Sequence, residues 1–243
     1  MKWKKIGRIL VLDYYPEDLK KILDKFDVDS IVKINEISGQ IREPKIELLY
    51  GETTETIHKE NGCLYNLDLS KIMWSKGNTN ERMRIAKLVN DNETVLDMFA
   101  GIGYFSIPIA IHSNPKKVIA IEINPNSFNY LKKNIILNKV QNKINPILGN
   151  CKDLDRNILV DRIIMGYIKT THHYLNSAIS ALNNGGILHY HETVPNKLIN
   201  TRPINRIKKT AKNKKVKLLN TKTIKKYAPG VSHVVLDVQI NEK

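Results

Sequence analysis

The segment that most constrains the fold is residues 95–106, Val-Leu-Asp-Met-Phe-Ala-Gly-Ile-Gly-Tyr-Phe-Ser, in which a short apolar strand leads into a glycine-rich turn and a helix. In open α/β sheets such a turn places backbone N–H groups and a helix N-terminus at the carboxyl end of a central strand, where ligands bind. Gly101 and Gly103 allow a tight turn and the close approach of a ligand. Ser106 stands where a third glycine would complete a dinucleotide-binding motif. The segment therefore predicts an α/β fold with a nucleotide-like ligand at this turn.

Strands and helices alternate after Thr94, which is typical of a mostly parallel sheet with helices on both faces. We expect strands at 94–98, 118–123, 144–148, 162–166, 187–191, 215–220 and 234–240, and helices at 104–112, 127–138 and 172–182, the last ended by the glycines of 184–186. The link at 221–233 is too short for a helical crossover. The final two strands should therefore pair antiparallel at one edge of the sheet.

The first part of the chain has a different pattern. Short strand-like runs occur at 8–12, 30–34, 45–50 and 62–67, with one amphipathic helix at 16–25. A further helix at 78–90, whose start Thr79 or Asn80 can cap, leads into the alternating region. We therefore expect a small α+β N-terminal domain at residues 1–77 and a ligand-binding α/β domain at residues 78–243.

The net charge of +15 is concentrated in two segments. Residues 202–226 contain eleven Lys or Arg and no acidic residue, and residues 1–12 contain four more, so these segments account for the whole net charge. A run of this kind forms either a solvated lysine-rich face or a surface that binds a polyanion through its phosphates. Composition alone leaves both interpretations open.

Composition and spacing exclude several other classes of protein. The chain is 42% hydrophobic and 26% charged, which is typical of a globular protein. The apolar run at 9–12 is too short for a signal peptide or a membrane helix, so we expect a cytoplasmic protein without a membrane partner. Cys63 and Cys151 lack CxxC or Cys/His spacing, so we expect neither a disulfide framework nor a metal site.

Acidic and amide side chains at the strand ends suggest which ligand binds. Asp97 opens the glycine turn, and Glu122 ends the next strand, 19 residues beyond Gly103, where a carboxylate can accept both ribose hydroxyls. Asn150 follows the third strand of the α/β region, where its amide could contact an adenine amino group. Strand-end capping is the alternative role for each of these residues.

The position of Asp97 separates two candidate cofactors. An acid beside the turn suits a ligand with a cationic α-amino group, such as S-adenosylmethionine (AdoMet), whereas it would repel the pyrophosphate of NAD. We therefore expect AdoMet, bound by Asp97, Gly101, Gly103 and Glu122. The expected site also includes four neighbouring residues, namely Phe99, Ala100, Ile123 and Cys151.

Further motifs accompany the turn: Glu122-Ile-Asn-Pro125, Trp74-Ser75 with Asn80-Glu-Arg-Met-Arg84, Tyr227-Ala-Pro-Gly230, and Gly39-Gln-Ile-Arg-Glu-Pro44 with His58-Lys-Glu60. In this order and spacing they resemble class I AdoMet-dependent transferases, and more narrowly the archaeal and eukaryotic group that modifies the purine next to the anticodon of tRNA. The resemblance spans nearly the whole chain. It implies a Rossmann-like, mostly parallel sheet with an antiparallel edge strand, preceded by a small N-terminal α+β domain.

Two reactions occur within that group. The guanine-N1 methyltransferases carry an Asn-Leu-Pro or Asn-Pro-Pro-like turn after the fourth strand, whereas this chain reads Met165-Gly-Tyr-Ile-Lys169 there. With Gly186-Ile-Leu-His-Tyr-His-Glu192 on the fifth strand, this departure is similar to the wybutosine-pathway enzymes. Those enzymes transfer the 3-amino-3-carboxypropyl arm of AdoMet to C7 of 4-demethylwyosine in phenylalanine tRNA and release methylthioadenosine.

Three other functions stay open at this point. A tRNA guanine-N1 methyltransferase differs mainly in the turn at 165–169. A non-catalytic, basic RNA-binding protein would keep the fold without binding AdoMet tightly. An NAD dehydrogenase is disfavoured by Asp97 and Ser106.

The resemblance also implies roles for individual residues. Ser75 and Arg82 would anchor the methionine arm of AdoMet, with the guanidinium holding its carboxylate as a charged fork. Beyond what the resemblance implies, residue type and position suggest three more candidates: the aromatic ring of Tyr167 could stack on the tricyclic base. His191 and Glu192 are candidates to position the base or accept its proton, although a packed or solvent-bonded histidine would fit the pattern equally well.

The expected partner is the anticodon region of phenylalanine tRNA, with AdoMet as co-substrate and no metal. The length leaves no room for a separate domain that reads the body of the tRNA, so the cations of 202–226 would supply much of the affinity for RNA. We expect the protein to be a monomer.

Overall fold

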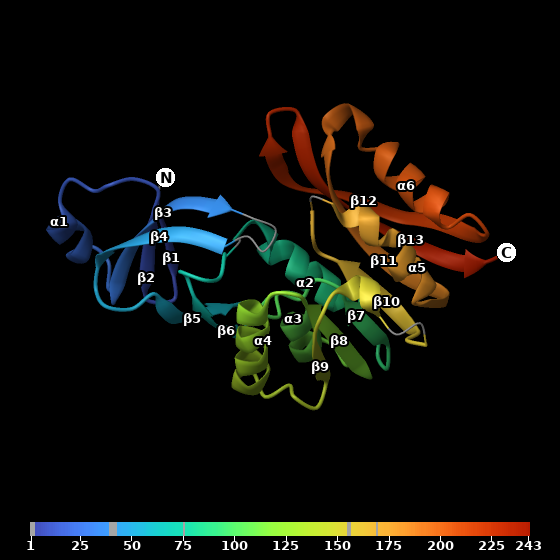
Figure 1. Ribbon diagram of the computed structural model, residues 1–243, viewed down its shortest axis with the longest axis horizontal. Helices are drawn as coiled ribbons and strands as arrows, with labels where there is room; N and C mark the ends of the chain where they lie inside the picture. The colour runs from blue at the N-terminus through green and yellow to red at the C-terminus, as the bar shows by residue number, and fades with distance from the viewer. Residues whose placement is uncertain (1–2, 39–42, 75, 155–156, 169) are drawn as a thin grey trace.

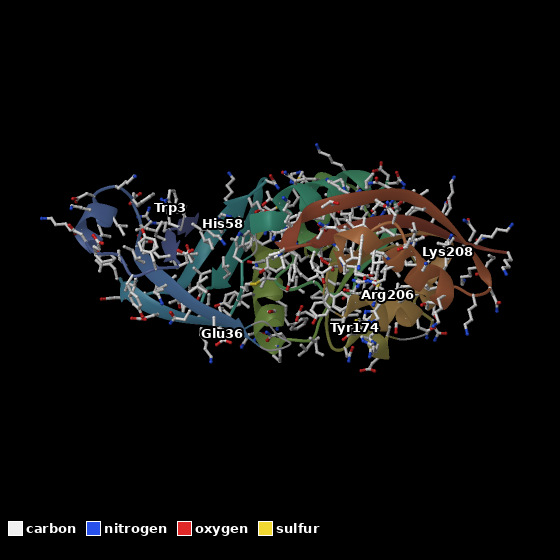
Figure 2. The ribbon with its side chains drawn as sticks, turned by 90° about the horizontal axis from the view of Figure 1, so that it is seen from above. Trp3, Glu36, His58, Tyr174, Arg206 and Lys208 are labelled. Carbon is white, nitrogen blue, oxygen red and sulfur yellow. The ribbon has the colours of Figure 1, made fainter. Side chains whose placement is uncertain are left out.

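The computed structural model describes residues 3–38, 43–74, 76–154, 157–168 and 170–243. Figure 1 shows an elongated molecule with a small N-terminal sheet at one end and a larger sheet, which contains the C-terminal strands, at the other. Figure 2 gives the same arrangement from above, with Trp3 and Glu36 on the small sheet and Lys208 at the opposite end.

The small sheet has the strand order β1-β2-β3-β4. Its strands are β1 (Trp3–Ile6), β2 (Ile9–Leu12), β3 (Ser30–Ser38) and β4 (Glu43–Tyr50). Helix α1 (Leu19–Leu23) joins β2 to β3, which run parallel, and the carboxylate of Asp18 accepts the N–H groups of Lys20 and Lys21 at its start. This helix is shorter than the 16–25 expected from periodicity.

A hairpin of β5 (Glu55–Glu60) and β6 (Cys63–Asp68) follows. The free edge of β6 pairs with two asparagine side chains where a neighbouring strand would otherwise bind. Asn134 belongs to helix α4 (Pro125–Leu137), and Asn138 is the C-terminal cap of that helix. The side chain of Asn134 exchanges hydrogen bonds with the backbone of Asn66, and that of Asn138 does so with Leu64. Because these bonds satisfy the open edge of β6, the hairpin is fastened to the larger part of the molecule. The domain boundary at residue 77 stays a prediction.

The large sheet has the order β12-β13-β11-β10-β7-β8-β9. Its strands are β7 (Thr94–Asp97), β8 (Lys117–Glu122), β9 (Ile144–Leu148), β10 (Val160–Met165), β11 (Leu182–Pro195), β12 (Lys214–Ala228) and β13 (Val231–Glu242). The first five run parallel, and β13 pairs antiparallel with both β11 and β12. The expected mostly parallel sheet with an antiparallel edge strand is confirmed.

Helices cover both faces of this sheet. One face carries α2 (Thr79–Leu88), α3 (Ser106–His112) and α4, whose buried residues share a hydrophobic core with the β5–β6 hairpin. The other face carries α5 (Leu175–Ser180) and α6 (Arg202–Thr210) over a second core. Four short 3₁₀ helices complete the described elements, namely η1 (Lys76–Asn78), η2 (Cys151–Asp153), η3 (Thr171–Tyr174) and η4 (Asn196–Leu198).

The C-terminal part departs from the sequence-based prediction in two places. The expected loop at 221–233 is instead a long β12–β13 hairpin that turns at Pro229 and Gly230, where Gly230 takes φ 69°. Strand β11 begins at Leu182, so the glycines expected to end a helix lie within this strand. Helix α6 and strands β1 and β5 were not predicted. The full length of β12 was not predicted because many lysines on this exposed edge strand interrupt the usual alternation of apolar and polar residues.

A chain of buried ionic contacts crosses the large sheet. Arg84 of α2 lies between Glu81 and Asp237, with contacts of 2.6–3.0 Å. Asp237 also accepts a hydrogen bond from Nδ1 of His189, whose Nε2 lies 2.8 Å from Arg162, and Arg162 pairs with Glu93.

His189 connects the two sets of ion pairs in this network while its imidazole remains neutral. Burial lowers the pKa of His189, so Nε2 accepts from the guanidinium of Arg162 and Nδ1–H donates to Asp237. Hydrogen bonds from His189 and Arg84 keep the pKa of Asp237 below its usual range despite burial. The contacts join α2, β10, β11 and β13 into one polar network inside the sheet.

Replacing Asp237 tests this network. Asp237→Asn removes a buried carboxylate that pairs with the partly buried Arg84 and accepts a hydrogen bond from His189, so we expect the free energy of unfolding to fall by about 3 kcal/mol. Urea denaturation at pH 7.5 measures this change. The exposed Asp91, changed to Asn as a control, should alter stability by no more than about 0.5 kcal/mol. Equal stabilities of the two variants would contradict a structural role for the network.

Candidate functional site

A cavity of about 580 Å³ opens where the strand order of the large sheet reverses. The chain proceeds from β7 to β8 and β9 on one side and to β10 and β11 on the other, so the loops after β7 and β10 separate at the carboxyl edge. Such switch points are the usual ligand sites of open α/β sheets. Its walls come from β8, β12 and β13, from the loops that follow β7, β9 and β10, from the segment before α2, and from the small N-terminal sheet.

The glycine turn after β7 is held by Glu122 at the end of β8. The carboxylate of Glu122 accepts the N–H groups of Gly101 and Asn124, each at 2.7 Å. Gly101 has φ 59° and Gly103 φ 101°, and a β-carbon at either position would lie within 2.7 Å of a neighbouring side chain. Burial raises the pKa of Glu122, while these backbone hydrogen bonds oppose the increase. Glu122 thus presents a fixed carboxylate to the cavity.

The structure corrects the role expected for Asp97. Its side chain is fully buried beneath the turn, where it accepts a hydrogen bond of 2.7 Å from the hydroxyl of Ser106 and one of 3.4 Å from the N–H of Phe99. Asp97 does not line the cavity, so it is not placed to meet the amino group of a ligand. Ser106, which departs from the three-glycine motif, is therefore the partner that orders Asp97 and the start of α3. Ala100 and Gly103 likewise shape the turn without lining the cavity.

Aromatic and apolar side chains form the walls beside Glu122. The ring of Phe99 stacks on Tyr167 with centroids 5.4 Å apart and meets Tyr174 edge-on at 5.0 Å. Ile123, half exposed, follows Glu122 on the rim. Flat apolar walls around one carboxylate suit a ligand that combines an aromatic ring with a sugar. The predicted residues Phe99, Glu122, Ile123 and Tyr167 therefore come together at one cavity.

Asn150 and Cys151 lie on the same side. The side-chain oxygen of Asn150 accepts the N–H of Lys152 at 3.0 Å and thereby caps η2, so this residue has a local structural role as well as a place in the cavity wall. Burial raises the pKa of the Cys151 thiol to about 12 and that of Cys63 to about 11. Both cysteines are free, buried and protonated at neutral pH.

Arg82 enters the cavity from α2 between two aromatic rings. Its guanidinium lies 4.8 Å from the ring centroids of both Trp74 and Tyr104, and Nη1 contacts the carboxylate of Glu60 at 2.6 Å. The residue is 2% exposed. The pairing with Glu60 was not foreseen, because nothing local in the sequence joins residues of a hairpin to a helix that begins 19 positions later. Ser75, the other predicted anchor, lies outside the described residues.

Glu192 does not face the cavity, which corrects the prediction that it contacts the base. It is 1% exposed and accepts hydrogen bonds from Tyr190, Arg202 and Arg206 at 2.7–2.9 Å. Alternation along β11 places residues 190 and 192 on the face covered by α5 and α6. Glu192 therefore anchors α6 to the sheet.

His191 points to the opposite face but lies one layer behind the cavity. It is fully buried, meets the ring of Phe105 at 5.6 Å, and its Nδ1 is 3.0 Å from Nε2 of His233. His233, on the neighbouring strand β13, lines the cavity. Sequence reasoning missed it. The available signal was the alternation of His233, Val235 and Asp237, which puts two polar side chains on one strand face.

Within the described ranges, no group of three or more His, Cys, Asp or Glu side chains is arranged to hold a metal ion. None of the helices built from these residues has the length and apolar character needed to cross a bilayer.

The buried Asp97 predicts an unusual pH dependence. Burial raises its pKa from 3.8 to about 6, so the folded chain retains a proton that the unfolded chain has lost between these two pH values. The contribution of Asp97 to the free energy of unfolding therefore falls as pH rises from about 4 to about 6. Asp97→Asn removes this loss, and we expect the variant to be more stable than the wild type by roughly 1–2 kcal/mol at pH 8, but not at pH 4.

Thermal unfolding of the ligand-free protein across this pH range measures the difference. The exposed Asp91, changed to Asn, provides the matched control and should show no such pH-dependent gain. A variant less stable than the wild type at pH 8 would instead show that the ionised carboxylate of Asp97 holds the turn together.

Comparison with known proteins agrees with this geometry. The sequence profile described as the TRM5/TYW2 methyltransferase domain matches residues 56–219. The tRNA(Phe) (4-demethylwyosine(37)-C(7)) aminocarboxypropyltransferase of Methanocaldococcus jannaschii is 46% identical over 244 residues, which cover 98% of each chain. The tRNA (guanine(37)-N(1))-methyltransferase Trm5b of Pyrococcus abyssi is 37% identical over 250 residues, which cover 97% of this chain and 74% of that protein.

The solved structures include a similar fold with a ligand. The crystal structure of M. jannaschii TYW2 in complex with AdoMet superposes on this chain with a TM-score of 0.84 at 43% sequence identity, and both chains are covered completely. The profile match takes in about two thirds of the chain, and the similarity to the M. jannaschii enzyme extends over almost all of it. This chain belongs to the TRM5/TYW2 family.

Proposed function

We propose that this chain transfers the 3-amino-3-carboxypropyl group of AdoMet to C7 of 4-demethylwyosine at position 37 of phenylalanine tRNA and releases methylthioadenosine. The observation that carries this function is the 46% identity, over 98% of both chains, to an enzyme with that activity. Identity to the guanine-N1 methyltransferase Trm5b of P. abyssi is lower, at 37%. The Asn-Pro turn expected of a methyltransferase is also missing at residues 165–169, so the aminocarboxypropyl reaction is favoured over methyl transfer.

The cavity fits AdoMet by its size and by its chemistry. Its volume of about 580 Å³ lies within the range of ordinary cofactor sites. Each oxygen of Glu122 accepts one backbone N–H and retains a lone pair for a ribose hydroxyl. Phe99 and Ile123 would flank the adenosine, and Cys151 would border the adenine edge together with Asn150, whose contact with adenine the sequence suggested. When bound, AdoMet supplies three activated carbons on its sulfonium.

The choice among these carbons depends on how the methionine arm is held. Arg82 is proposed to bind the carboxylate of this arm, with Trp74 and Tyr104 keeping its guanidinium in a fixed plane. The carbon held in line with C7 of the base, at roughly 3–3.5 Å, is the one attacked. Tyr167, already stacked on Phe99, would extend the aromatic surface on which the tricyclic base rests.

The tRNA is proposed to bind across the basic C-terminal region. Glu192 neutralises part of the charge of Arg202 and Arg206, and Lys214 pairs with Glu242. Exposed lysines remain along α6 and β12, namely Lys208, Lys209, Lys212, Lys215, Lys217 and Lys226. Figure 2 shows Arg206 and Lys208 on this end of the molecule. The clustering of these cations favours a phosphate-binding surface over a merely solvated one.

We further propose that the protein is a cytoplasmic monomer and that it needs no metal.

Differential labelling of AdoMet tests the reaction. The protein is incubated with tRNA that bears 4-demethylwyosine and with AdoMet labelled either in the methyl carbon or in the carboxyl carbon. We expect the carboxyl label to enter the RNA in equal amount to the methylthioadenosine released. Methyl label in the RNA would show a methyltransferase instead. Neither label in the RNA, together with no AdoMet binding in equilibrium dialysis, would show a non-catalytic RNA-binding protein.

Arg82→Lys tests the proposed anchor without removing the positive charge beside Glu60. A lysine cannot form the two parallel hydrogen bonds of a guanidinium, so we expect the dissociation constant for AdoMet to rise about tenfold. Equilibrium dialysis without tRNA measures it. Arg8→Lys, at an exposed arginine of the small sheet, provides the matched control. Equal affinities in the two variants would remove Arg82 from the AdoMet site.

A further inference from the structure

His233 of β13 lines the cavity, as Glu122 at the end of β8 does, and three strands of the large sheet separate β13 from β8. On β13 it lies in register with Thr193 of β11 and with Lys225 of β12. Thr193 in turn donates its N–H and its hydroxyl to the carbonyl of Ile168, in the loop after β10 that also carries Tyr167. These contacts join the segments that carry His233 and Tyr167, both of which line the cavity, so His233 belongs to the side where Tyr167 is proposed to meet the base.

The two ring nitrogens of His233 have different surroundings. Nε2 lies 3.0 Å from Nδ1 of His191, whereas Nδ1 has no hydrogen-bond partner among the described residues. The residue is 1% exposed, so bulk water does not compensate for this missing contact. A buried polar nitrogen without a partner calls for an explanation, and because His233 lies in the wall of a cavity, a ligand in that cavity can supply the missing contact.

The hydrogen bond to His191 determines what the free nitrogen can do. When His233 donates Nε2–H to Nδ1 of His191, its own Nδ1 carries a lone pair toward the unpartnered side. The same bond persists if His233 gains a proton at Nδ1, because Nε2–H remains the donor. His191 can therefore accept the same hydrogen bond from the neutral and from the protonated form of His233. This gives a reason for placing the buried His191 directly behind His233, which lines the cavity.

His233 is neutral at physiological pH and so able to accept a proton. Burial, with a smaller effect from the positive charge of Lys225, lowers its pKa to about 4. Burial also lowers the pKa of His191. A base this weak suits the proposed reaction, because the proton on a ring carbon becomes strongly acidic once the ring carries a positive charge.

We propose that Nδ1 of His233 accepts the proton that leaves C7 of the base after the aminocarboxypropyl group has joined it. This inference rests on the proposed function. The π electrons of the ring double bond at C7 attack the γ-carbon of the methionine arm and form the new C7–carbon bond. The bond from that γ-carbon to sulfur breaks, and its electrons remain on sulfur in methylthioadenosine. The base then carries one positive charge and a C7–H bond. Transfer of this proton to Nδ1 restores the aromatic ring, and the imidazolium returns the proton to water when the products leave.

The test uses His233→Asn, because an amide can still form hydrogen bonds in the cavity but cannot accept a proton. The substrate is tRNA with 4-demethylwyosine carrying either hydrogen or deuterium at C7. We expect kcat to fall by about tenfold or more, and the ratio of the rates with hydrogen and deuterium to rise above that of the wild type. The rise follows because loss of the C7 proton becomes rate-limiting. The dissociation constant for AdoMet should stay within about twofold of the wild type.

His173→Asn is the matched control, since this exposed histidine of η3 does not line the cavity. It should leave kcat and the isotope ratio unchanged. A kcat for His233→Asn within about twofold of the wild type would overturn the proposal. A lower kcat without any rise in the isotope ratio would also overturn it, because that result indicates a structural or positioning role. Failure of the wild-type protein to transfer the carboxyl label would instead refute the proposed function.

Discussion

Asp237 and Glu81 hold Arg84 between them, and the placement of helix α2 depends on this contact. The two acids come from β13 and from α2 itself, so the interaction fixes the helix against a strand that is 153 positions away from it in the sequence. Arg82 is two residues before Arg84 and lines the cavity. The main role of the Arg84 ion pairs is therefore to fix the position of α2, and with it Arg82, relative to the sheet. Ion pairs of this kind contribute little net stability compared with an apolar core.

The cavity is built from parts of the chain that are far apart, and each part supplies one kind of interaction. The first strands of the large sheet give the fixed carboxylate of Glu122 and the flat walls around it. The β5–β6 hairpin and the segment before α2 supply the charged and aromatic surroundings of Arg82. The C-terminal hairpin contributes His233 and the neighbouring Lys225. A transferase that must hold both a charged co-substrate and a large base needs all three groups around one space.

The sequence allowed the α/β fold to be predicted, and it also indicated the residues around Glu122 that line one part of the cavity, because both depend on local signals. Strand and helix periodicity, the glycine turn and the acid at the end of the next strand all lie within residues 94–122. The remainder depends on contacts between distant segments. Asp97 ends β7 as expected, whereas Glu192, expected just after the fifth strand, lies inside β11. Both side chains point away from the cavity, toward Ser106 and toward α6 respectively. Likewise, the arrangement of two adjacent strands decides that His233 rather than His191 reaches the cavity.

The cost of burying unpaired charge explains why the net charge of +15 is found at the surface of the molecule. Buried cations of the described chain are matched by acids, as Arg82 is by Glu60 and Arg162 by Glu93. Burying a charge without a partner would cost several kcal/mol, so folding selects these neutral arrangements in the interior. The surplus cations are therefore displaced to the surface, chiefly to α6 and β12, where water screens them and no such penalty applies. A polyanion can reach them there without disturbing the ion pairs that position the cavity.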